Sequence, residues 1–265
     1  MVPKLFVLAA TFLLATTAVP CIPRPDATIP TLPSTGAVDL PAPNPASSLK
    51  AIAIGHGIQN YTCASGSATS IAAGALAVLY DVTEFYPGTP KTGLTAAGFE
   101  SLSSKVLWGQ NIPLNLVDQT AASPGTPEKP NDGLPPAAYG AAEDVDPFMA
   151  PADLDLGLLR LKFLGHHYFD ATGTPTFDLH ERSLRFSVKL KQSVSQPPAA
   201  DKGVLGTGAV RWLLLNDSGA GLSTLGDQSQ VYRVITAGGF GQGCSTEGAV
   251  PKSSVPYSAF YWFYG

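Results

Sequence analysis

The sequence predicts a mainly β protein, built as a single antiparallel β-sandwich or barrel-like domain with one or two short helices and long loops. The 27 glycines and 24 prolines among 265 residues favour many turns between short strands over a helical bundle. Several strand-like runs lie between these turns, as in sandwiches and barrels. A hydrophobic content of 45% with only 14% charged residues excludes disorder over the whole chain and allows a large core.

The N-terminal 18 residues are typical of a secretory signal peptide. Lys4 precedes an apolar run over residues 5–14, and small residues follow at 16–18, where cleavage would occur. The run is too short to span a membrane. Residues 19–48 contain eight prolines and predict an extended, disordered arm, which leaves 49–265 for the β-rich domain. We therefore expect a secreted, extracellular protein that is not held in a membrane after signal cleavage.

The elements of the domain follow from local patterns. Residues 70–79 are expected to form a short helix because they are rich in alanine, although Gly74 weakens it. A second short helix is expected over 95–107, with Thr95 as its N-cap. Residues 118–152 are rich in proline, glycine, alanine and acidic residues and predict a long surface loop. Strands are expected at 53–62, 158–169, 174–179, 184–190, 209–215, 231–235 and 257–264.

Two of these segments allow more detailed expectations. Residues 170–173 end in Gly173 and predict a hairpin turn between two strands. In the aromatic C-terminal segment, extended backbone would place Tyr261 and Phe263 on one side. Phe260, Trp262 and Tyr264 would then face the other side. We expect one set to fill the core and the other to cover a surface or the N-terminal arm.

Export would place the cysteines in an oxidising compartment, which favours disulfides. Cys63 ends a predicted strand and Cys244 follows a Gly-rich turn, so this pair is favoured for a bridge. Cys21 lies in the Pro-rich arm and would be the odd cysteine. Two Asn-x-Ser/Thr sequons predict N-glycosylation at Asn60, within a strand, and at Asn216, in a polar and accessible turn.

The densest cluster of ionisable groups contains His166, His167, Asp170, Asp178 and His180. Asp178 and His180 would share a strand face, and the hairpin would bring them across from one of the paired histidines. Such a patch could bind zinc, copper or manganese, or could supply an acid–base pair. The spacing matches no recurring metal-ligand pattern, so a structural, hydrogen-bonded cluster is favoured and no metal is expected. His166, His167, Asp178 and His180 are therefore only weak catalytic candidates.

Other sites and partners find little support in the sequence. His56, between Gly55 and Gly57, is expected to be structural. The formal charge of −4, without a cluster of basic residues, argues against nucleic-acid binding. Residues 219–226 partly match the Gly-x-Gly-x-x-Gly pattern of dinucleotide sites, but Thr224 replaces the third glycine and a strand is predicted next. We therefore expect a loop between antiparallel strands, no NAD-dependent dehydrogenase activity and no cofactor.

Motifs in a fixed order give this chain a family resemblance. They are GHGIQNYTC at 55–63, LGHHY at 164–168, GTPTFDL at 173–179, VRWLLL at 210–215, VYRV at 231–234, TAGG at 236–239 and YWFY at 261–264. Together they resemble a family of secreted fungal and bacterial proteins, domain-of-unknown-function family 3455. The resemblance implies export, one β-rich domain and a bridge between Cys63 and Cys244. It implies no catalytic residue and no cofactor. Some fungal members carry the label malate dehydrogenase, which the residues here do not support.

These observations lead to two hypotheses about function. The first is a secreted, non-enzymatic protein that acts at the cell wall or in the extracellular medium and binds a cell-wall glycan or a small extracellular ligand. The second is an extracellular enzyme that uses the His/Asp cluster, with or without a metal. Convergent imidazoles at an open cavity would favour the enzyme, whereas buried and hydrogen-bonded imidazoles would favour the binding protein.

Overall fold

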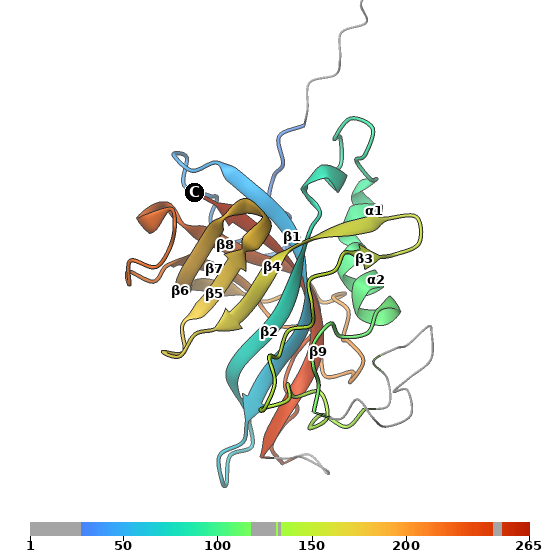
Figure 1. The fold of residues 1–265 in the computed structure, drawn as a ribbon, viewed down its shortest axis with the longest axis vertical. Coiled ribbons are helices and arrows are strands. Elements are labelled where there is room, and N and C mark those ends of the chain that lie inside the picture. The colour runs from blue at the N-terminus through green and yellow to red at the C-terminus, as the bar shows by residue number, and fades with distance from the viewer. Residues whose placement is uncertain (1–27, 118–130, 132–133, 246–250) are drawn as a thin grey trace, which may run out of the picture.

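In the part of the chain that the structure describes, nine strands form one antiparallel sheet that closes on itself. The computed structural model describes residues 28–117, 131, 134–245 and 251–265. The strand order is β2-β1-β9-β8-β7-β6-β5-β4-β3, and an additional antiparallel pairing joins β2 to β4 (Figure 1). The strands are β1 (Leu49–Thr62), β2 (Ile71–Asp81), β3 (Leu154–Asp155), β4 (Arg160–Phe169), β5 (Pro175–Leu179), β6 (Leu184–Val194), β7 (Trp212–Asp217), β8 (Gln230–Gly238) and β9 (Lys252–Tyr264). The protein is thus mainly β, as predicted, and the closed sheet is barrel-like.

The two faces of the closed sheet bury two separate apolar clusters. The inner cluster consists of strand residues, and the outer cluster also contains residues of the helices and loops. Tyr261 and Phe263 of β9 belong to the inner cluster. Phe260, Trp262 and Tyr264 belong to the outer cluster. The predicted alternation along β9 is therefore confirmed, and both of its faces are buried.

Two short helices cover part of the outer face. They are α1 (Ala96–Glu100) and α2 (Leu102–Gly109), seen beside β9 in Figure 1. The Thr95 side chain accepts a 3.1 Å hydrogen bond from the backbone N–H of Gly98, which confirms the predicted N-cap. Phe99 of α1 packs against Phe260 of β9, with ring centroids 4.8 Å apart. Three single-turn 3₁₀ helices, η1 (Thr83–Phe85), η2 (His180–Arg182) and η3 (Gly226–Gln228), lie in connections.

The prediction of a helix over residues 70–79 is wrong, because this segment forms strand β2. It is paired along its length with β1 and, at its C-terminal end, with β4. Ala75 and Ala77 belong to the inner cluster, which also holds bulky aromatic side chains such as Tyr261. Small side chains fill the space that the aromatic residues leave. Pairing on both sides outweighs the helix propensity of alanine, which amounts to only tenths of a kcal/mol per residue.

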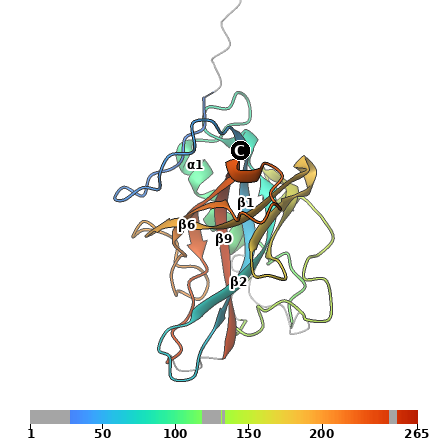
Figure 2. The same cartoon turned by 90° about the vertical axis from the view of Figure 1, so that its left-hand side faces the viewer.

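The described part of the Pro-rich arm, residues 28–48, follows the surface of the domain without helix or strand before β1 (Figure 2). The Tyr232 hydroxyl donates a 3.1 Å hydrogen bond to the carbonyl oxygen of Pro41. The backbone N–H of Asn44 donates to Oε1 of Gln230 at 2.8 Å. Leu32 and Leu40 pack against the outer cluster. The predicted signal peptide and Cys21 lie outside the described residues.

The disulfide between Cys63 and Cys244 is confirmed, with Cα atoms 5.6 Å apart. It joins the end of β1 to the segment that follows β8. Asn60 lies in β1, as expected, and its side chain accepts a 2.6 Å hydrogen bond from the Ser254 hydroxyl. Asn216 lies in β7 and not in the expected turn, because both β6 and β8 pair with it. Within the described residues, no helix has the length and apolar character needed to cross a membrane.

Candidate functional site

The hairpin of β4 and β5 is confirmed, but it places the two adjacent histidines on opposite faces of the sheet. His166 lies opposite Asp178 in the register, and His167 lies opposite Phe177. The His167 side chain points into the closed sheet, where it is 4% exposed and stacks on Phe177 with ring centroids 3.9 Å apart. Its Nδ1 atom lies 2.9 Å from the carbonyl oxygen of Thr176. His167 is therefore separated from solvent and from the other candidates.

The remaining three candidates come together on the outer face. The His166 and His180 rings have centroids 5.4 Å apart, and Nδ1 of His180 lies 3.9 Å from Oδ1 of Asp178. The other carboxylate oxygen, Oδ2, is 2.7 Å from a guanidinium nitrogen of Arg185. Phe148 stacks on His166 with centroids 4.0 Å apart. Because Arg185 already neutralises Asp178, this carboxylate is a weak partner for an incoming cation or for a catalytic imidazole.

Burial keeps the imidazoles of His166 and His167 neutral at physiological pH. It lowers the pKa of His166 to about 4, and the nearby charge of His180 lowers this pKa further. Burial also lowers the pKa of His167 to about 4. A base with such a pKa abstracts protons poorly near pH 7. Among the residues that the structure describes, no group of three or more His, Cys, Asp or Glu side chains is arranged to hold a metal ion.

Asp170 and His56 both have structural roles, because each forms hydrogen bonds with the protein backbone. Oδ1 of Asp170 accepts hydrogen bonds from the backbone N–H groups of Thr172 and Thr174, so it holds the hairpin turn together. His56 belongs to β1 and is fully buried, next to the residue that follows α2. Its two ring nitrogens each lie 3.3 Å from a carbonyl oxygen, one of Tyr257 and one of Gln110. Burial lowers the pKa of His56 to about 4.

A β-bulge in β4 brings Phe163 next to the outer histidines. Tyr80 of β2 pairs with Phe163 and Leu79 pairs with Gly165, so Leu164 is an extra residue. Leu164 belongs to the inner cluster, whereas Phe163 belongs to the outer one. The extra residue puts Phe163 and His166 on the same face, with ring centroids 5.3 Å apart. In a regular strand, residues three apart face opposite sides.

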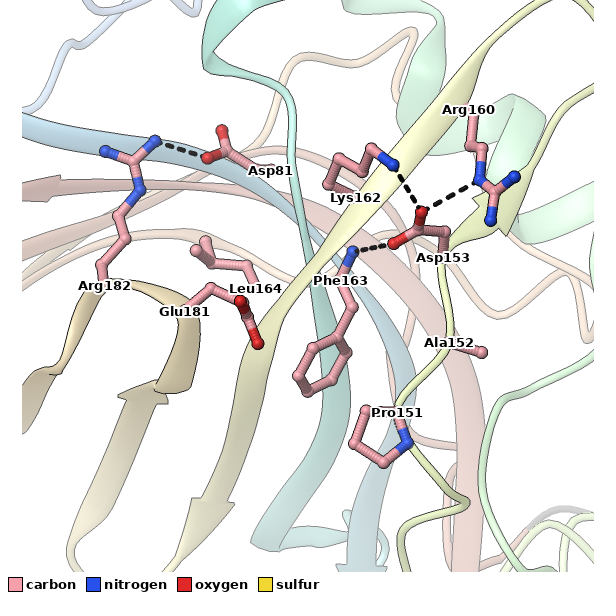
Figure 3. Close-up of a pocket in the computed structure, with 10 residues that line it drawn as sticks. All are labelled: Asp81, Pro151, Ala152, Asp153, Arg160, Lys162, Phe163, Leu164, Glu181 and Arg182. Atoms are coloured by element: carbon pink, nitrogen blue, oxygen red, sulfur yellow. Dashed lines mark hydrogen bonds and ion pairs between the residues drawn. The ribbon is translucent and has the colours of Figure 1, made fainter.

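A cavity of about 860 Å³ lies beside this bulge, and we call it the charged groove. It is bounded by the end of β2, the first half of β4, η2 and residues 151–153 (Figure 3). Asp153 accepts hydrogen bonds from Arg160 at 2.9 Å and from Lys162 at 2.8 Å. Its other oxygen accepts a 3.0 Å bond from the backbone N–H of Phe163. The Lys162 bond, then the Phe163 bond, lower the pKa of Asp153 to about 2.

The opposite side of the charged groove carries a second ion pair and one further carboxylate. Arg182 pairs with Asp81 and also donates a hydrogen bond to the carbonyl oxygen of Lys50. Glu181 is exposed, and within the described residues it has no ion-pair partner (Figure 3). No sequence motif predicts this groove. Its only local signal is the alternation of Arg160 and Lys162 with apolar residues at the start of a strand, which is common on exposed strands.

Comparison with known proteins places the chain in a family. A family model described as "Protein of unknown function (DUF3455)" matches residues 43–265. The chain belongs to this family. The DUF3455 domain thus begins in the last residues of the arm and includes all of the strands, the disulfide and the charged groove. Neither the curated proteins nor the solved structures include a match to this chain.

The Gly-rich segment of this DUF3455 domain is a connection between neighbouring antiparallel strands. Residues 219–226 lie between β7 and β8, which pair with each other directly. The segment leads into the single turn η3 and then into β8. The prediction of a loop between antiparallel strands is therefore confirmed, and the strand–helix context of a dinucleotide fingerprint does not surround this segment.

Proposed function

We propose that this protein acts outside the cell, at the cell wall or in the surrounding medium, as a non-catalytic protein whose charged groove binds a glycan. Two observations support an extracellular location. The N-terminal 18 residues have the composition of a signal peptide. The Cys63–Cys244 bridge suits an oxidising compartment.

The balance of charges in the groove is the observation that carries the glycan proposal. The three acidic side chains are Asp81, Asp153 and Glu181, and three basic side chains, Arg160, Lys162 and Arg182, oppose them. A ligand of high net charge would therefore gain little. A neutral polyhydroxylated ligand gains more, because each hydroxyl donates to a carboxylate oxygen and accepts from a guanidinium or ammonium group.

The groove also offers order and apolar surface. The ion pairs hold the charged side chains in place before a ligand arrives, which reduces the entropy lost on binding. Pro151, Phe163 and Leu164 line the same cavity. Pro151 and Phe163, on the outer side of the sheet, can contact the C–H faces of a sugar while the charged groups contact its hydroxyls.

Glu181 provides the sharpest test, because it is exposed and its removal breaks no ion pair described above. We expect the protein to co-sediment with at least one insoluble cell-wall polysaccharide in a panel of β-glucans, chitin and xylan. Glu181→Ala should weaken this binding about tenfold or more, since a hydrogen bond to a charged group contributes about 1.5–3 kcal/mol. Glu100→Ala changes another exposed glutamate, which lies at the end of α1 and does not line the charged groove; it is the matched control and should bind normally. Failure to bind any of the polysaccharides, or normal binding by Glu181→Ala, would contradict the proposal.

The second candidate function is an extracellular enzyme that uses His166, Asp178 and His180. Its support is the 5.4 Å approach of the two imidazoles on the outer face. If a metal bound there, zinc would raise the melting temperature of the parent protein by mass action, and His180→Ala would remove the rise. Under the binding-protein proposal, zinc leaves the melting temperature unchanged. Asp178→Ala should then only destabilise the fold, because Arg185 loses its partner.

A further inference from the structure

A second cavity, of about 260 Å³, adjoins the charged groove and differs from it in chemistry. We call it the apolar pocket. Its lining is mainly hydrophobic and includes Val78, Tyr80, Ile112, Pro113, Met149 and Leu154. It is also more enclosed than the charged groove. A pocket of this kind favours an apolar group over water.

The two cavities adjoin each other and share four lining residues. Pro151, Ala152, Asp153 and Phe163 line both of them. Pro151 and Ala152 are exposed, so the boundary between the cavities is open to solvent and not a buried wall. A single ligand can therefore extend from one cavity to the other across residues 151–152.

The polar groups at this boundary leave the apolar pocket without a free charge. Both oxygens of the Asp153 carboxylate are already engaged, by Arg160 and Lys162 on one side and by the backbone of Phe163 on the other. Gln110, which also lines the pocket, donates its amide N–H to the carbonyl oxygen of Asp155 at 3.0 Å. Asn111 and His166 line the pocket as well; His166 is neutral at pH 7, because burial lowers its pKa to about 4, and its buried Nε2 atom has no hydrogen-bond partner among the described residues. The ligand group in the apolar pocket therefore needs no charge to match, and one polar atom of the pocket is left for it to contact.

From this juxtaposition we infer that the ligand is a glycan unit that carries an aryl substituent, with the sugar in the charged groove and the aromatic ring in the apolar pocket. The volume fits one substituted ring, since a cavity of about 150 Å³ already binds benzene. Tyr80 and Phe163 offer aromatic edges or faces, and Met149 offers a flexible thioether that packs well against aromatic rings. This inference rests on the proposed function of the charged groove.

Paired probes test the inference directly. Methyl and phenyl β-glycosides of glucose, galactose, xylose and N-acetylglucosamine are titrated into the full mature protein by calorimetry. For a sugar that binds, we expect the phenyl glycoside to bind about tenfold more tightly than the methyl glycoside, because its ring leaves water. Met149→Asp should abolish this difference by placing a charge at the apolar pocket.

Val145→Asp is the matched control for this variant. Val145 is 52% exposed, close to the 49% of Met149, and it lies on the same loop but lines neither cavity. It should retain the tenfold difference, and both variants should keep the parent melting temperature. Equal affinities of the paired glycosides, or a difference that survives Met149→Asp, would overturn the aryl inference and leave the glycan proposal standing. If phenol alone bound as tightly as the phenyl glycosides, and Glu181→Ala had no effect, both proposals would fall.

Discussion

Mild acid should destabilise this protein strongly, because two histidines are buried as neutral imidazoles. His56 of β1 is buried beneath Gln110, which follows α2, and His167 lies inside the closed sheet. Burial lowers the pKa of each from its ordinary value of 6.5 to about 4. Below pH 6.5 the unfolded chain therefore takes up protons that the folded protein excludes. The contribution of the two neutral histidines to the free energy of unfolding is therefore present above pH 6.5 and is lost as the pH falls towards 4.

The size of the loss follows from the shift in pKa. Between pH 7 and pH 5, each histidine lowers the free energy of unfolding by about 2 kcal/mol, so the pair lowers it by about 4 kcal/mol. A domain has a total stability of about 5–15 kcal/mol, so the loss is a large fraction of it. The pKa of the partly exposed His166 is also lowered to about 4, so His166 adds to the effect in the same direction. Ordinary carboxylates contribute little above pH 5.

Guanidinium chloride unfolding at pH 7, 6 and 5 measures this effect. His167→Phe provides the critical comparison, because it keeps an aromatic ring stacked on Phe177 and removes one titrating group. We expect the pH dependence of the variant to be smaller than that of the parent by the contribution of one histidine. A free energy of unfolding that stays constant between pH 7 and pH 5 would refute the reasoning. So would an unchanged pH dependence in His167→Phe.

Three further predictions concern stability and ligands. Replacing Cys63 and Cys244 by serine opens a loop with a sequence separation of 181 residues and should lower the free energy of unfolding in denaturant by about 5 kcal/mol. Non-reducing peptide mapping that found free thiols at these positions in the parent would contradict the bridge. Gly57→Ala would place a Cβ atom 1.9 Å from the carbonyl oxygen of Leu76 and should cost about 3 kcal/mol or more, whereas Gly109→Ala, with nothing within 4 Å, should be neutral or slightly stabilising. Calorimetric titration with NAD or NADP should show no micromolar binding, because β7 and β8 are antiparallel neighbours and the Gly-rich connection between them opens no crossover helix.

Local patterns predicted much of the fold. The alternation of side chains gave both faces of β9, and glycine at 173 with aspartate at 170 gave the hairpin turn. The strand β2 was mistaken for a helix because its alanines are explained only by what surrounds them. Their small size suits an interior that Tyr261 and Phe177 fill from other strands. Such packing depends on contacts between distant segments, which a local window of sequence does not contain.

The candidate site was harder to predict for the same reason. The bulge at Leu164 moves Phe163 to the face of His166, and it arises from the pairing of β4 with β2, which no composition reveals. The charged groove joins Asp81 to Arg182, 101 residues later in the chain. The hairpin pattern predicts that Asp178 lies across from one of the paired histidines, and the structure places it opposite His166. The assignment of His166 to the outer face and His167 to the inner face follows from the closure of the sheet, which the local sequence does not contain.

The pairing of β1 with β9 has a consequence for how the chain acquires its structure. The earliest strand of the domain lies beside the latest, in register from Leu49 opposite Tyr264 to Thr62 opposite Lys252. β9 also pairs with β8 and supplies aromatic residues to both apolar clusters. A chain that lacks its last dozen residues therefore has two unpaired strand edges and two incomplete cores. The sheet can therefore close only after β9 has been synthesised, and pairing between strands about 200 residues apart gives a high contact order, for which slow folding is expected.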